Sequence, residues 1–128
     1  MRNSWAATAS ILAMISVVLG AMASHYLKDK IPMESIQNFK LASQYMLVHS
    51  IALLAISLKF SSELKQIKYL FLVGMLFFSG SIFVLSTRTL TGLSFLKPIG
   101  VITPVGGVLL ILAWLLLGLS FLKKKTNP

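Results

Sequence analysis

His49 is the residue whose type and position point most directly to chemistry, because it lies near the middle of the apolar segment 41–58. An ionisable group in the middle of a membrane is costly and usually faces a partner or water, so His49 could carry protons. The alternative is a neutral imidazole that hydrogen-bonds to Ser79, Ser81 or a backbone carbonyl across a helix interface. We prefer the second interpretation.

A second candidate site is the start of the last apolar segment. Thr103 is a good N-cap, Pro104 suits the first helical position, and Gly106 and Gly107 then fall in the first turn, where backbone N–H groups have no intrahelical partner. Such a helix start suits an anion, and Arg88 could add positive charge. The alternative, which we prefer, is that the glycines only allow this helix to pack closely against another helix.

Four polar residues, one from each apolar segment or its end, fall at a similar depth near the predicted outer side of the membrane. They predict a polar pocket for an anionic guest such as a phospholipid headgroup or a small carboxylate. The candidate pocket comprises these four, His25, Gln44, Arg88 and Thr103, together with His49, Ser79, Gly106 and Gly107.

Catalytic and metal chemistry have little support in the sequence. The three acidic residues, Asp29, Glu34 and Glu63, all fall in predicted loops, and no Ser-x-Gly elbow follows a strand. Two histidines without any cysteine cannot supply the three or four ligands of a zinc site. We therefore expect no enzyme, no cofactor and no metal.

The composition indicates a membrane protein. Hydrophobic residues make up 56% of the 128 residues and charged residues 12%, and the mean hydropathy is +0.85. The formal net charge of +9 arises from 12 Lys and Arg residues that flank the apolar segments, where they orient helices and meet anionic lipid. We expect membrane lipids as partners and exclude nucleic acid.

Four apolar segments predict an all-α integral membrane four-helix bundle that forms a single domain over residues 1–128. The last of them, from Thr103 to Leu122, is about 30 Å long at roughly 1.5 Å per residue, which matches the hydrocarbon core of a bilayer. The predicted spans are about 4–23, 41–58, 69–86 and 103–122.

Small residues recur every three or four positions in the first segment and give it a face with little side-chain bulk, at Ala6, Ala9, Ala13, Ser16, Gly20 and Ala23. We expect this face to pack against the last helix, with Gly20 and Ala23 close to Gly106 and Gly107. The alternative reading of the segment is a secretory signal that is cleaved after Ala23. We expect the segment to be retained because its small residues are periodic.

Four spans place both termini on one side of the membrane. That side carries seven basic residues, Arg2, Lys59, Lys65, Lys68, Lys123, Lys124 and Lys125, and the other side carries five, Lys28, Lys30, Lys40, Arg88 and Lys97. Because basic residues are enriched in cytoplasmic loops, we expect both termini to lie in the cytoplasm. The membrane that we expect is a bacterial cytoplasmic membrane.

Short motifs in all four segments, taken in order, resemble the DUF423 family of small membrane proteins, which includes bacterial YwdK-like proteins. These motifs are Gly20-Ala21-Met22-Ala23-Ser24-His25, Tyr45-Met46-Leu47-Val48-His49 with Ala52-Leu53-Leu54, Phe78-Ser79-Gly80-Ser81, and Ile102-Thr103-Pro104-Val105-Gly106-Gly107 with Trp114. Met22 and Ser24 depart from the family's pattern, which has Phe and Gly there. The resemblance implies a four-helix integral membrane protein and implies no activity.

Two classes of function fit these observations. The first is a membrane module that binds a lipid or small ligand in a polar pocket or stabilises partner complexes. The alternative is a small transporter or channel that uses His49, which would be a homo-oligomer because four short helices enclose little volume.

Overall fold

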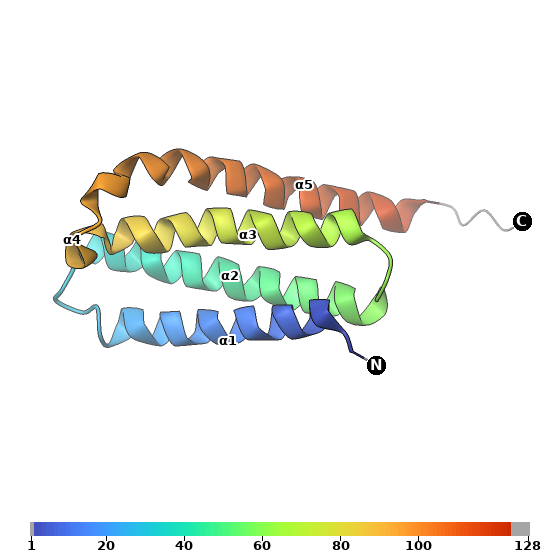
Figure 1. Cartoon of the computed structure of the whole chain (residues 1–128), viewed down its shortest axis with the longest axis horizontal. Helices are drawn as coiled ribbons and strands as arrows, with labels where there is room; N and C mark the ends of the chain where they lie inside the picture. Colours follow the sequence, from blue (N-terminus) through green and yellow to red (C-terminus); the bar gives the residue numbers. More distant parts are fainter. Residues whose placement is uncertain (1, 124–128) are drawn as a thin grey trace, which may run out of the picture.

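The computed structural model describes residues 2–123 as a bundle of helices (Figure 1). Lys124, Lys125 and both terminal residues, on which the expected topology partly depends, lie outside the described residues. The described elements are α1 (Ser4–Ser24), α2 (Met33–Lys59), α3 (Lys65–Ser86), α4 (Arg88–Thr91), the 3₁₀ helix η1 (Ser94–Val101) and α5 (Ile102–Leu122).

The lengths and surfaces of the helices fit a membrane. Four helical stretches, α1, α2, α3 and the continuous run Ser94–Leu122, are long and apolar enough to cross a bilayer. Their outward faces carry large apolar side chains such as Val17, Leu58 and Ile111, which are 61%, 67% and 67% exposed. Lipid covers such faces without cost, so the protein is an all-α integral membrane bundle, as the sequence predicts.

The helices pack in chain order. α1 packs along α2, α2 lies beside α3, and α3 packs against α5, with successive spans running in opposite directions (Figure 1). As a result α1 begins and α5 ends at the same end of the bundle. The other end, where α4 lies, is called the α4 end below. Within residues 2–123, no Cα atoms of α2 and α5 come within 8 Å of each other. Both helices pack against α3 instead.

The expected contact between the first and last helices is wrong. A Cβ atom on Gly20 would point at the Ser43 hydroxyl of α2, 3.0 Å away, whereas one on Gly106 would collide with the backbone of α3 at Phe78 and lie 2.9 Å from the carbonyl oxygen of Gly74. Gly106 therefore does allow close packing, but between α5 and α3. Gly74 supplies the partner surface on α3 that the prediction had assigned to α1.

Hydroxyl groups join each helix to the next. Ser43 of α2 donates to the carbonyl of Ser16 in α1 at 2.6 Å, and Ser79 of α3 donates to the carbonyl of Ala42 in α2 at 2.8 Å. Ser81 of α3 shares a hydrogen bond of 2.5 Å with the hydroxyl of Thr103 in α5. These bonds matter in lipid because burial of apolar area gives little drive for helix association there.

The start of α5 differs from the expectation. Thr103 is not an N-cap: α5 begins at Ile102, directly after η1, and no side chain caps it. Pro98 lies inside η1, whose turns continue almost without a break into α5. Because helical turns precede Gly106 and Gly107, the predicted helix start with free N–H groups at these glycines does not form. The Thr103 hydroxyl bonds to Ser81 instead of capping the helix.

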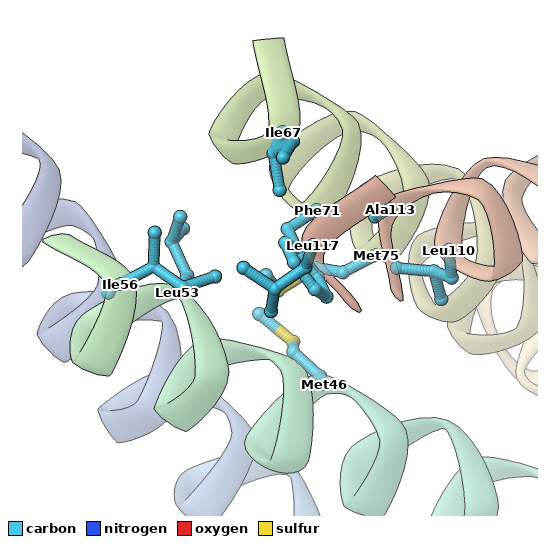
Figure 2. Close-up of a cluster of buried hydrophobic side chains, with 10 residues drawn as sticks. Met46, Leu53, Ile56, Ile67, Phe71, Met75, Leu110, Ala113 and Leu117 are labelled. Carbon is cyan, nitrogen blue, oxygen red and sulfur yellow. The ribbon is translucent and has the colours of Figure 1, made fainter. Parts of the chain in front are cut away.

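The core is a layer of apolar side chains shared by α2, α3 and α5, with Ala9 from α1 (Figure 2). Leu53, Phe71 and Ala113 are fully buried in it, and Figure 2 shows the side chains of the three helices pointing toward one another. This layer holds the helices that carry the candidate site in a fixed register.

The end opposite α4 is fastened by two polar side chains. Asn3 caps α1 by accepting from the N–H of Ala6 at 3.0 Å and also donates to the carbonyl of Ser57 at 3.1 Å, which ties α1 to α2. Lys68 is 1% exposed, and its ammonium donates to the carbonyls of Phe60 and Ser61 just past the end of α2. A cation there complements the negative end of the helix dipole.

Candidate functional site

A cavity lies between α2 and α5, and we call it the α2/α5 groove. It has a volume of about 630 Å³ and is lined mainly by Gln44, Tyr45 and His49 of α2, Phe78 of α3, and Gly107 and Trp114 of α5. Gly107 contributes no side chain, and a Cβ atom there would only reach ordinary contact with the Phe78 ring at 3.7 Å. The groove therefore exists because α2 and α5 stand apart and because a glycine faces the gap.

His49 closes one side of this groove and is 7% exposed. Its Nδ1 lies 2.6 Å from the carbonyl oxygen of Tyr45, and its Nε2 lies 3.0 Å from the indole nitrogen of Trp114. A carbonyl only accepts and an indole N–H only donates, so Nδ1 carries the proton and Nε2 accepts. The geometry therefore fixes one neutral tautomer with both ring nitrogens engaged.

Aromatic contacts fix the positions of Tyr45 and Trp114, the two residues that bond to His49. Trp114 packs edge-on against Phe71 with ring centroids 5.0 Å apart, and Tyr45 stacks on Phe78 at 4.9 Å. Such pairs favour these offset and edge-to-face arrangements and add to the energy of area burial. The His49–Trp114 bond is thus part of a rigid cluster that links α2, α3 and α5.

A second, more polar cavity lies toward the α4 end, and we call it the Arg88 cavity. It has a volume of about 300 Å³ and is lined by residues that include Ser35 and Asn38 of α2, Ser86 of α3, Arg88 of α4 and Thr103 of α5. Arg88 donates from Nη1 to the carbonyl of Leu85 at 2.9 Å, which holds the guanidinium against the end of α3. This cavity can therefore present a positive charge to a guest.

The predicted pocket residues fall at several places. Gln44, His49 and Gly107 line the α2/α5 groove, and Arg88 and Thr103 line the Arg88 cavity. Ser79 is used in the bond to α2, and Gly106 is buried against α3. His25 is exposed at the C-terminal end of α1 and lines neither cavity.

Sequence reasoning missed several residues of these sites. It named Ser79, Ser81 or a carbonyl of another helix as the partner of His49, whereas His49 bonds to the carbonyl of Tyr45 in its own helix and to the indole of Trp114. It also left out Ser35 and Asn38, which precede the predicted span yet share a helix face three residues apart. Ser86 gave no signal beyond its position at the end of an apolar segment.

The described residues contain no group of three or more His, Cys, Asp or Glu side chains that could hold a metal ion. The predicted pocket residues that line a cavity do so in the α2/α5 groove and the Arg88 cavity.

Comparison with known proteins agrees with this architecture. Residues 19–107 match a family described as a protein of unknown function, DUF423. The chain belongs to the DUF423 family. The matched range includes His49, Phe78, Arg88 and Gly107 of the two cavities, and it ends before Trp114.

Relatives of this DUF423 chain carry names that agree with a membrane location. It is 34% identical over 114 residues to a UPF0382 membrane protein of Staphylococcus saprophyticus, covering 87% of this chain and 90% of the relative. It is 34% identical over 119 residues to the UPF0382 membrane protein YwdK of Bacillus subtilis, covering 89% and 92%. A UPF0382 membrane protein of Haemophilus influenzae is 28% identical over 132 residues, covering 98% and 99%. No solved structure matches the chain.

Proposed function

We propose that this DUF423 protein is a lipid-binding membrane module whose α2/α5 groove holds one acyl chain of a membrane lipid. The observation that carries the proposal is the groove itself, about 630 Å³ in volume and lined largely by apolar and aromatic side chains. Pockets of this size and character suit apolar ligands. Val48 and Ile111 at its rim are 54% and 67% exposed, so the groove opens sideways, toward lipid.

A structural role fits the histidine better than transport does. A proton relay needs neighbours that take up and release protons, whereas His49 bonds to a backbone carbonyl, which only accepts, and to an indole N–H, which only donates. The alternative of a small oligomeric transporter or channel therefore has the weaker support, and we propose neither flux through this chain nor catalysis by it. A homo-oligomer stays an expectation from the sequence.

For the location we propose the cytoplasmic membrane, with both termini in the cytoplasm and the first helix retained. The excess of basic residues at the terminal end of the bundle supports the orientation. Retention is supported by the bonds that tie α1 to α2 at Asn3 and at Ser16. The α4 end, with the Arg88 cavity, then faces the outer leaflet.

Cross-linking tests the groove directly. The protein is reconstituted with a phospholipid that carries a photoactivatable diazirine in one acyl chain, and the labelled residues are mapped by mass spectrometry. We expect labelling to concentrate on groove residues such as Val48 and Ile111 over equally exposed apolar residues of α1, such as Val17. Even labelling of all lipid-facing surfaces would contradict the proposal.

A flux assay separates the two classes of function. Proteoliposomes that contain the wild-type chain or His49→Ala are loaded with a pH-sensitive dye and subjected to a proton gradient. The lipid-binding proposal predicts equal and background rates for both. A proton flux that His49→Ala abolishes would establish the transporter alternative in its place.

A further inference from the structure

The Arg88 cavity and the α2/α5 groove lie along the same faces of the same three helices. On α2 the lining residues Ser35, Asn38, Tyr45 and His49 follow helical spacing, and on α5 so do Thr103, Gly107 and Trp114. From Ser35 to His49 the rise along α2 is about 21 Å at roughly 1.5 Å per residue. The two cavities therefore follow one another from the α4 end toward the middle of the span.

Arg88, in the more polar of the two cavities, has N–H donors that its bond to Leu85 does not use. A guanidinium has five N–H donors, and the bond from Arg88 to Leu85 uses a single one of them. Residues 2–123 contain all three acidic side chains of the sequence, and none of these lines the cavity. The charge of Arg88 is thus available to a guest.

Ser86 offers a second polar group to a guest. Its side chain is 7% exposed and lines the Arg88 cavity, yet its hydroxyl has no hydrogen-bond partner among the described residues. The other buried serines each bond to a carbonyl or a hydroxyl, as Ser50 does to Met46 and Ser57 to Leu53. Among the described residues every fully buried side-chain nitrogen or oxygen has a partner, so the Ser86 hydroxyl is accessible from the cavity and can bond to a guest there.

Resting on the proposed function, we propose that the Arg88 cavity binds the phosphate of an anionic phospholipid, one of whose acyl chains lies in the α2/α5 groove. Arginine pairs with phosphate through charge-assisted, often bidentate hydrogen bonds. Ser86 and Asn38 add neutral polar groups beside it. Because no carboxylate lines the cavity to receive an ammonium group, the site favours a lipid with net negative charge over a zwitterionic lipid with the same chains.

The arrangement also sets the depth of the guest. Arg88 lies at the end of the spans, where phosphates of the bilayer lie, and the His49–Trp114 bond crosses the path near mid-membrane. A lipid held by its phosphate at Arg88 would place its chain along Phe78 and Gly107 and reach this crossing.

Native mass spectrometry of the full chain in detergent tests the inference. The protein is titrated with phosphatidylglycerol and with phosphatidylcholine of identical chains, as wild type, Arg88→Gln and the control Lys97→Gln, an exposed cation of η1. We expect wild type and Lys97→Gln to bind phosphatidylglycerol about tenfold more tightly than phosphatidylcholine, since one charged pair lost is worth about that factor. Arg88→Gln loses this preference and keeps the weaker binding of both lipids.

The outcomes separate the inference from the proposed function. Equal affinities for both lipids in wild type, or an unchanged preference in Arg88→Gln, would overturn the phosphate site while leaving the acyl groove in place. Absence of any bound lipid would overturn both. Displacement of phosphatidylglycerol by soluble sn-glycerol 3-phosphate at similar concentration would assign the site to free phosphates and contradict the lipid. If Arg88→Gln does not give monodisperse protein, Ser86→Ala takes its place and is expected to lower the preference a few-fold.

Discussion

Trp114 donates its indole N–H to Nε2 of His49 across 3.0 Å and so joins α5 to α2, although the two residues are 65 positions apart and their helices otherwise flank an open groove. The bond satisfies two polar groups that lipid cannot satisfy. It also fixes the width of the groove at its inner end, because the positions of both rings are held by Tyr45 and Phe71.

Removal of the two partners of this bond should have non-additive effects on the stability of the bundle. Trp114→Phe leaves the buried Nε2 of His49 without a donor, for which we expect a loss of about 1 to 3 kcal/mol in the free energy of unfolding. Adding His49→Leu to Trp114→Phe removes the stranded acceptor, so the double variant should lose less than the sum of the two single variants. Thermal unfolding in a mild detergent measures all three. Strict additivity would show that the bond carries no coupling.

The close approach of α5 to α3 predicts a different cost at two glycines of the same helix. Gly106→Ala places a methyl group against the backbone of Phe78, so the helices must separate, at a cost typical of overpacking, about 1 to 3 kcal/mol. Gly118→Ala meets no atom within 4 Å and serves as the matched control. We expect its midpoint of thermal unfolding to equal or exceed that of the wild type. Equal midpoints for both variants would contradict the observed packing.

Loss of the Lys68 ammonium should lower the stability of the bundle far more than loss of the Lys65 ammonium. Lys68→Met leaves the carbonyls of Phe60 and Ser61 without their ammonium partner, and hydrogen bonds to a charged group contribute about 1.5 to 3 kcal/mol. Lys65 is exposed, so Lys65→Met removes one charge from the same helix turn and should leave stability unchanged. The comparison of their unfolding midpoints in detergent checks this prediction. A similar small loss in both would mean that Lys68 acts only as a surface charge.

Single cysteines test the orientation, because the natural sequence has none. Lys28→Cys lies at the α4 end of the bundle and Lys65→Cys at the terminal end. In intact cells a membrane-impermeant maleimide should label the first variant, and the second only after the cells are opened. The reverse pattern would place the termini and Lys68 outside and move the Arg88 cavity to the inner leaflet.

The sequence was sufficient to predict the class of the fold. Long apolar segments bounded by charges such as Lys59 and Lys65 indicate spanning helices by length and transfer energy alone, and residues 2–123 contain four such helices. The pairing of helices was harder to predict, because small residues occur on α1, α3 and α5 alike. Gly106 could have met Gly20 as readily as Gly74, and only the three-dimensional arrangement decides between them.

The candidate site was also predictable only in part, because its local contacts follow from the sequence and its contacts between helices do not. His49 could be singled out as a buried polar residue, and its bond to the carbonyl of Tyr45 is the local i−4 partner that a helix offers. Its second partner, Trp114, depends on the tilt and separation of α2 and α5, which no local pattern encodes. Thr103 looked like an N-cap because the following segment is apolar, but η1 extends the helix upstream and frees its hydroxyl for Ser81.

Retention of lipid by variants that fill the groove tests the central claim most directly. Gly107→Leu extends a side chain into the α2/α5 groove from a position where its first carbon makes ordinary contacts, and Gly118→Leu adds the same side chain to an open surface of the same helix. After purification in mild detergent, native mass spectrometry counts the lipids bound to each. We predict that wild type and Gly118→Leu retain one phospholipid and that Gly107→Leu retains none. Equal retention by all three proteins would contradict a lipid site between α2 and α5.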